Sequence, residues 1–183
     1  NGSFVITWSS YVQDGSADGI YFQRYSSGGA TNGSETIVNS TTTDDQVRPS
    51  VSILTNDGFA ITWSSYSQDG SFMGSYLQLF NTDGSTLGSE TIINTRTTDF
   101  QQNSDVAGYD ASTTLVTTWQ DGLRNSTSTN DADNYGIYTQ RYTVSGFLPV
   151  ELLSFEATAL ENQTALLEWS TLSERNNEGF FVE

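Results

Sequence analysis

An internal repeat constrains the fold more than any other feature of the sequence. Positions 4–46 align without a gap on positions 59–101, and 26 of the 43 aligned pairs are identical. Trp8, for example, recurs as Trp63, which sets the period at 55 (63 − 8). Identity at a fixed period predicts that each copy forms the same structural unit, which buries its hydrophobic face against its neighbours.

A third copy of the repeat carries a longer loop. The step from Trp63 to Trp119 is 56 (119 − 63), whereas the step from Tyr76 to Tyr138 is 62 (138 − 76). The loop between these positions has therefore grown by six residues (62 − 56), and it contains the polar run 122–134. Loops on a rigid scaffold often carry binding residues, so this run is the first place to look for a site.

The repeat unit predicts four short β-strands. The stretch 4–8 alternates apolar and polar side chains, and 20–25 alternates again after an Asp- and Gly-containing loop. We expect a third strand over 35–39 and a fourth from Pro49, a strand start where the missing N–H donor is tolerated. We count three strands for the first copy, four for the second and three for the third. Four short strands per unit are typical of propeller blades.

The sequence predicts an all-β chain with two domains. We assign 1–146 to the C-terminal blades of a propeller-like repeat domain and expect its N-terminal part to be missing, because closed propellers have about four to eight blades. The segment 147–183 is predicted to be the start of a β-sandwich, with Trp169 on the second of three strands. A sandwich needs about 100 residues, so we expect this one to be incomplete.

The composition argues against several classes of partner. Six Arg and no Lys or His stand against 22 Asp and Glu, which gives a formal net charge of −16. Nucleic-acid affinity comes largely from cations that displace counterions, so no nucleic-acid partner is expected. No run approaches the ~18 apolar residues of a transmembrane helix, so no membrane span is predicted. The acidic surface either attracts Ca²⁺ or simply remains solvated.

The sequence predicts no enzymatic activity. Without His, Cys or Lys, the chain lacks His-based triads, thiolate nucleophiles and the usual zinc ligands. The paired carboxylates of a glycosidase remain an alternative. However, Glu35 and Glu90 stand at the same place in two copies, within a repeated Gly-Ser-Glu-Thr, and this favours an architectural role.

Four aspartates in loops are the candidate metal ligands. Asp14 and Asp69 occupy equivalent points of two Gln-Asp-Gly-Ser loops, and Asp131 and Asp133 stand two residues apart in the enlarged loop. Calcium takes about six to eight oxygen ligands, which makes it the possible cofactor. The alternative is that each Asp caps its own turn through a hydrogen bond from the backbone to its side chain.

The candidate ligand-binding residues lie in the enlarged loop of the third copy. They are Arg124, Asn130, Asp131, Asp133 and Tyr135. A Tyr-x-Gln-x-aromatic motif is a second candidate, since its rings and amide suit a sugar. It comprises Tyr21, Gln23 and Tyr25; Tyr76, Gln78 and Phe80; and Tyr138, Gln140 and Tyr142. Because the motif recurs on the same face of every copy, the alternative is that it packs between blades, with the Gln amide bonding neighbouring backbone.

The second copy carries a recognisable motif. It runs Phe59-Ala60-Ile61-Thr62-Trp63-Ser64-Ser65-Tyr66, then Gln68-Asp69-Gly70-Ser71, Tyr76, Gln78, Gly88-Ser89-Glu90 and Asn94-Thr95. The motif resembles the repeats of very large secreted bacterial adhesins and calcium-associated exoproteins, and the resemblance covers about residues 1–143. It implies propeller-like blades, but no ligand is common to that group.

A different motif fills the C-terminal segment. It runs Leu148-Pro149-Val150-Glu151-Leu152-Leu153-Ser154-Phe155, then Leu167-Glu168-Trp169-Ser170 and finally Phe180-Phe181-Val182. This segment is similar to the fibronectin-like module that precedes type IX secretion sorting domains in Bacteroidetes exoproteins. The resemblance implies an Ig/fibronectin-like sandwich and export by the type IX machinery through a missing C-terminal domain. It also implies an extracellular or outer cell-surface location on a Gram-negative bacterium.

These observations predict a non-catalytic secreted or cell-surface repeat protein that acts in adhesion or extracellular assembly. The expected partner is an extracellular glycan or a surface protein. Two alternatives stay open at this point. One is a carbohydrate-binding propeller module of a larger secreted polysaccharide-degrading enzyme, and the other is a self-assembling repeat fibre.

Overall fold

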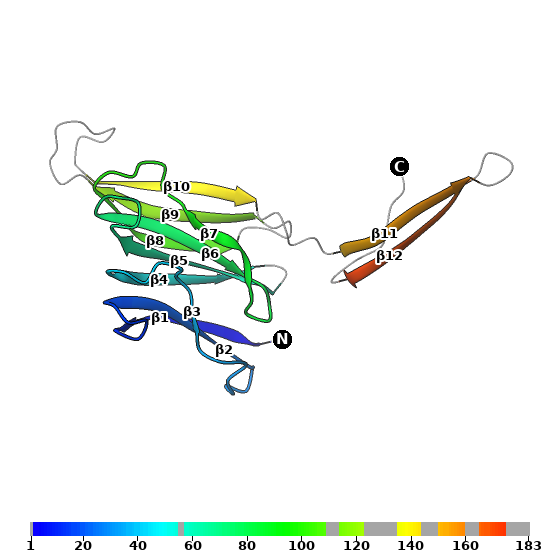
Figure 1. Cartoon of the computed structure of the whole chain (residues 1–183), viewed down its shortest axis with the longest axis horizontal. Coiled ribbons are helices and arrows are strands. Elements are labelled where there is room, and N and C mark those ends of the chain that lie inside the picture. The colour runs from blue at the N-terminus through cyan, green and yellow to red at the C-terminus, as the bar shows by residue number, and fades with distance from the viewer. Residues whose placement is uncertain are drawn as a thin grey trace. The chain divides into compact units, whose positions relative to one another are not determined.

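The computed structural model confirms an all-β chain (Figure 1). It describes residues 2–54, 57–108, 114–122, 135–143, 150–159 and 165–174, and no helix lies among them. Accordingly, this part of the chain holds no helix that is long and apolar enough to cross a membrane. The backbone divides into two compact units, Asn1–Val144 and Ser145–Glu183.

The first unit contains ten described strands. They are β1 (Phe4–Tyr11), β2 (Asp18–Tyr25), β3 (Thr36–Ile37), β4 (Gln46–Ile53), β5 (Phe59–Tyr66), β6 (Met73–Phe80), β7 (Thr86–Ile92), β8 (Phe100–Gly108), β9 (Thr114–Gly122) and β10 (Tyr135–Thr143). Strands β1–β2–β3 form one antiparallel sheet. Strands β4–β5–β6–β7 and β8–β9–β10 are two further antiparallel runs, which a single parallel pairing of Met73 with Phe100 joins into one seven-stranded sheet.

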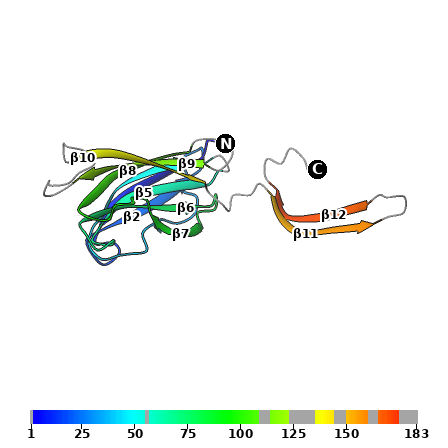
Figure 2. The same cartoon turned by 90° about the horizontal axis from the view of Figure 1, so that it is seen from above.

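We call these three runs the first, second and third sheets. They contain three, four and three strands, whereas the copies themselves contribute four (β1–β4), four (β5–β8) and two (β9 and β10) of the described strands, so the count per copy differs from the three, four and three expected from the sequence. The first strands of the second and third sheets come from the end of the preceding copy, because β4 pairs with β5 and β8 pairs with β9. Figure 1 shows β1 and β2 at one side of this unit and β10 at the other, and Figure 2 shows the same strands from above.

Pro49 lies inside β4 and not at its first residue, so the predicted start of this strand was wrong. The pairing of β4 with β5 shifts register between Val47 and Ser50, which is a β-bulge. Arg48 within the bulge has a φ of 58°, and its counterpart Asn103 in β8 has a φ of 56°. A bulge leaves a residue unpaired, so Pro49 can occupy the strand interior although it has no N–H to donate.

The backbone repeats as closely as the sequence does. Every described residue with a positive φ has a counterpart one repeat period away. The pairs are Gly2 and Asp57, Val12 and Ser67, Gly15 and Gly70, Gly29 and Gly84, Gly33 and Gly88, Asp44 and Asp99, and Arg48 and Asn103. Even the β-branched Val12 adopts a φ of 63°, which such residues normally avoid. The unit as a whole therefore imposes these conformations.

Each sheet has two faces, because residues directly opposite on antiparallel strands point to the same side. In the first sheet, Phe4, Ile6, Trp8, Tyr21, Gln23 and Tyr25 form what we call the Trp face. The other side, which we call the Arg face, carries Val5, Thr7, Ser9, Ile20, Phe22 and Arg24. Equivalent positions define the same two faces on the second and third sheets.

The core lies where the Arg face of the first sheet meets the Trp face of the second. Its buried members are Ile20, Phe22, Val38, Phe59, Ile61, Trp63, Tyr76 and Phe80. The ring of Phe22 meets those of Phe59 and Phe80 edge-on, with centroids 5.1 and 4.8 Å away. Burial of such rings is the main favourable contribution to packing one copy on the next.

The Arg face of the second sheet is covered in turn by the third sheet. The Tyr142 hydroxyl on β10 donates to the Ile93 carbonyl at 3.1 Å, and the Ser75 hydroxyl on β6 donates to the Gln101 carbonyl on β8 at 3.0 Å. Successive sheets thus pack Arg face on Trp face.

The second unit contains an antiparallel pair, β11 (Val150–Ala159) and β12 (Ala165–Glu174). Phe155 stands directly opposite Trp169 in the register. Strand β12 continues five residues beyond Trp169, to Glu174. The third strand predicted over 180–182 lies outside the described residues.

Candidate functional site

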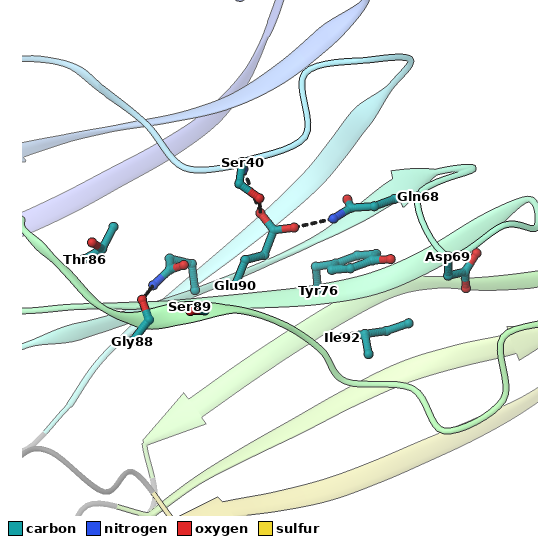
Figure 3. A pocket seen from close by; sticks show the side chains of 10 residues that line it. Ser40, Gln68, Asp69, Tyr76, Thr86, Gly88, Ser89, Glu90 and Ile92 are labelled. Atoms are coloured by element: carbon teal, nitrogen blue, oxygen red, sulfur yellow. Dashed lines mark hydrogen bonds between the residues drawn. The ribbon is translucent and has the colours of Figure 1, made fainter.

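A cleft of about 730 Å³ opens at the seam between the first and second copies. It is lined by Ser40, Gln68, Asp69, Tyr76, Gln78, Thr86, Gly88, Ser89, Glu90 and Ile92. In Figure 3, Glu90 lies between Ser40 and Gln68, and the Tyr76 ring lies beside it. The cleft therefore combines one carboxylate with amide, hydroxyl and aromatic groups.

Glu90 on β7 connects two copies of the repeat. Its Oε2 accepts hydrogen bonds from the backbone N–H of Ser40 at 2.8 Å and from the Ser40 hydroxyl at 3.0 Å. Its Oε1 accepts a hydrogen bond from the Gln68 side-chain amide. Glu35, the counterpart in the first copy, accepts the same bond from Gln13. The carboxylate of Glu90 is thus occupied by the protein's own donors.

Asp69 caps the loop between β5 and β6, which is the alternative to metal binding that the sequence left open. Its Oδ1 accepts the backbone N–H of Ser71 at 3.1 Å, and Asp14 accepts that of Ser16 at the same distance. The other oxygen, Oδ2, is buried in both residues and has no hydrogen-bond partner in the described chain. A Cβ at Gly74, near the start of β6, would lie only 3.0 Å from Asp69 Oδ2, so a side chain there would have to displace the capping carboxylate.

Tyr76 provides the aromatic wall of the cleft. It is 6% exposed and stacks on Trp63, with ring centroids 6.1 Å apart. Burial raises the pKa of the Tyr76 phenol above its ordinary value, and the negative charges of Asp69 and Glu90 raise it further. Burial likewise raises the pKa of Tyr21 in the first copy. The phenol of Tyr76 is therefore neutral at physiological pH and retains its proton as a donor.

Gln78 connects the backbones of β6 and β7, the strands that form the floor of the cleft. Its buried amide donates to the carbonyls of Leu79 at 2.9 Å and of Leu87 and Gly88 at 3.3 Å. Gln23 makes the equivalent bonds to Arg24 and Gly33. The prediction that these amides bond neighbouring backbone is confirmed for both residues, which leaves the Gln78 amide without a free N–H directed at a ligand.

Most of the ligand-binding residues predicted from the enlarged loop fall in a part of the chain that the structure does not describe. Arg124, Asn130, Asp131 and Asp133 lie outside the described residues. Tyr135 is the first residue of β10, where it is 56% exposed and stands opposite Gly122. Asp14 and Asp69 remain in the loops of separate copies. Among the residues that the structure describes, no three His, Cys, Asp or Glu side chains gather to hold a metal ion.

The sequence analysis did not predict that Ser40, Gln68 and Glu90 are joined by hydrogen bonds. A signal for part of it was available, because Gln and Glu recur together in both copies at the same separation (35 − 13 and 90 − 68). Ser40 has no such signal, since its counterpart is Thr95. The cleft offers hydrogen-bonding and stacking groups but no activated nucleophile.

No family model matches the chain, and no curated protein or solved structure is significantly similar to it.

Proposed function

We propose that the chain is a non-catalytic repeat scaffold of a secreted or cell-surface protein that acts in adhesion or extracellular assembly. One observation carries this proposal. The side chains that recur between copies make the same internal bonds in each, as Gln13–Glu35 and Gln68–Glu90 do. Residues that are used identically in successive copies serve the architecture of the array and not a single reaction centre.

The proposal includes a propeller-like arrangement of blades followed by a fibronectin-like module. Consecutive antiparallel sheets that pack face to face support the first part, as does the supply of β4 to the second sheet by the end of the first copy. The β11–β12 pair, with Trp169 on its second strand, supports the second part. The secretion route and a Bacteroidetes origin rest on the motif around Pro149.

The test has two arms. Beads that carry the full chain should be retained on surfaces coated with extracellular glycans or surface proteins, whereas beads that carry a denatured chain should not. The same chain should release no reducing ends from a polysaccharide panel. Sugar release that Glu90→Ala abolishes and Glu35→Ala preserves would show an enzyme instead, and a chain that no surface retains would contradict the adhesion role.

Carbohydrate binding in the cleft is the second candidate function. The observation that favours it is the lining of the cleft, which brings the Gln68 side chain together with the neutral Tyr76 phenol and the hydroxyls of Thr86 and Ser89. On a glycan array, Gln68→Ala should reduce the signal of any bound sugar, while the matched variant Gln13→Ala should keep it. Equal signals from the two variants would place the sugar elsewhere.

A further inference from the structure

We propose that Asn32 is a site of spontaneous deamidation, in which the backbone nitrogen of Gly33 attacks the Asn32 side chain and water completes the conversion to aspartate or isoaspartate. This inference goes beyond the scaffold role, because it concerns a covalent change that the chain undergoes without a partner. The product is a new carboxylate beside Arg24, at the contact between the first and second copies.

Asn32 differs from the other asparagines that the structure describes. Its side chain is exposed and makes no hydrogen bond to any residue of the described chain, and it alone among them precedes a glycine. The side chains of the other four are each held by at least one hydrogen bond. These four are Asn39, Asn81, Asn94 and Asn103. The Asn32 side chain is therefore free to turn towards the next peptide group.

Gly33 offers the attacking nitrogen. Its N–H has no hydrogen-bond partner in the described part of the chain, although the groups on either side are held. The Asn32 N–H donates to the Arg24 carbonyl at 2.8 Å, and the Gly33 carbonyl accepts the Gln23 amide at 3.2 Å. Because Gly33 has no Cβ, its own side chain does not hinder the approach of the Asn32 Cγ, and it adopts its φ of 83° without strain.

Arg24 places a positive charge over this dipeptide. Asn32 stands opposite Arg24, because the bridge between Tyr25 and Thr31 sets the register. A Cβ built on Gly33 would lie 2.9 Å from Arg24 Nη2, so the guanidinium lies against Gly33. A cation in this place favours both the deprotonated amide nitrogen and the oxyanion that its attack creates. We therefore expect Arg24 to accelerate the reaction.

The exposure of this turn does not depend on what precedes the first copy. Arg24, opposite Asn32, belongs to the Arg face, which the second copy covers within this chain. In the second copy the equivalent Gly88 is exposed and lines the cleft, although the first copy packs against that sheet. Water therefore reaches this position of the repeat when a neighbouring copy is in place.

The reaction is a hydrolysis and needs no reactant other than water. The Gly33 nitrogen gives its proton to solvent and bonds to the Asn32 Cγ, and the side-chain nitrogen leaves as ammonia, which yields a succinimide. Water then opens the ring. Cleavage of the new bond to Cγ gives aspartate, whereas cleavage between the Asn32 carbonyl carbon and the Gly33 nitrogen gives isoaspartate, whose backbone runs through the side chain.

The test incubates the full native chain in heavy-oxygen water, at neutral and mildly alkaline pH, and then digests it after Arg and Glu. The resulting peptide 25–35 contains Asn32 and no other asparagine. We expect it to gain heavy oxygen in both aspartate and isoaspartate forms, and faster at the higher pH because the attacking nitrogen must lose its proton. Asn39 is the control within the chain. Its buried amide donates to the Thr41 carbonyl at 2.8 Å and should remain an amide.

Two variants separate the effect of the structure from that of the dipeptide. Arg24→Gln should slow the conversion of Asn32 several-fold in the native chain and leave it unchanged in urea, where no guanidinium is held over Gly33. A loosened turn would speed the reaction, so a slower rate reports the lost charge. Leu87→Asn creates an Asn-Gly pair in the second copy, where Leu79 replaces Arg24, and this pair should convert more slowly than Asn32 in the same molecule.

Two results would overturn the proposed site: a native peptide 25–35 that gains no heavy oxygen while the urea-unfolded chain gains it there, or an Asn39 that converts as fast as Asn32. A native rate that Arg24→Gln leaves unchanged would overturn the role of Arg24.

Discussion

Glu90 and Ser40 are hydrogen-bonded across the seam between two copies of the repeat. The Glu90 carboxylate accepts the Ser40 backbone N–H and hydroxyl at 2.8 and 3.0 Å. Glu35, its counterpart, bonds Gln13 within the first copy but receives no such pair of donors among the described residues. The same residue in the same motif thus connects copies at one position and not at the other.

Glu90→Ala should therefore destabilise the chain more than Glu35→Ala does. Loss of the two bonds from Ser40 should lower the free energy of unfolding by about 1–2 kcal/mol, while Glu35→Ala should cost roughly 0.5 kcal/mol or less. Both variants lose one negative charge, so they are matched. Urea unfolding followed by Trp fluorescence measures the difference, and equal costs would contradict the role of Glu90 at the seam.

Gln78→Leu should be strongly destabilising. The buried amide donates to the carbonyls of Leu79, Leu87 and Gly88, and removing it takes away three hydrogen bonds to partly buried acceptors, at a cost of about 1–3 kcal/mol in total. Gln140→Leu is the matched control, because the Gln140 side chain is exposed and, among the residues that the structure describes, donates to the Arg141 carbonyl alone. Thermal unfolding of both variants decides the matter, and a Gln140 variant as unstable as the Gln78 variant would refute this reading.

Tyr76 should make the fold sensitive to alkali. Burial and the charges of Asp69 and Glu90 raise its pKa above the unfolded value of 10.0. A folded pKa above the unfolded one stabilises the fold below about pH 10, and this contribution is lost as the pH rises through the folded pKa. Tyr76→Phe should therefore flatten the fall in stability above about pH 10. The raised pKa values of Tyr21 and Tyr142 should preserve part of that fall. Urea midpoints across this range test it, and a profile unchanged by Tyr76→Phe would count against it.

Calcium, if it stabilises the chain, should act independently of Asp69. Asp69 uses Oδ1 to cap its turn, and its Oδ2 is buried against Gly74. Asp69→Asn should therefore leave the difference in melting temperature between calcium and chelator unchanged. The same difference in melting temperature is measured for a double variant that carries both Asp131→Asn and Asp133→Asn in the enlarged loop. A calcium effect that only Asp69→Asn abolishes would contradict the expectation.

Much of the local structure is predictable from spacing alone. The period of two in 4–8 and the identity between copies predict strands and turns that the structure contains. Pro49 was misplaced because a bulge is not visible in a hydrophobic pattern, and it changes which residues need a donor. The cleft was missed for another reason. Ser40 reaches Glu90 only because two copies pack face to face, and Ser40 differs from its own counterpart, Thr95.

The sequence by itself determined the all-β class, the repeat unit and the approximate positions of most of its strands, since each follows from contacts within one copy. Only the tertiary structure decided which sheet each strand joins and which residues contact one another where two copies meet. It also decided that Ile6 is exposed while its counterpart Ile61 is buried. The physical reason is that identical copies carry identical side chains, so burial depends on whether a neighbouring sheet covers that face.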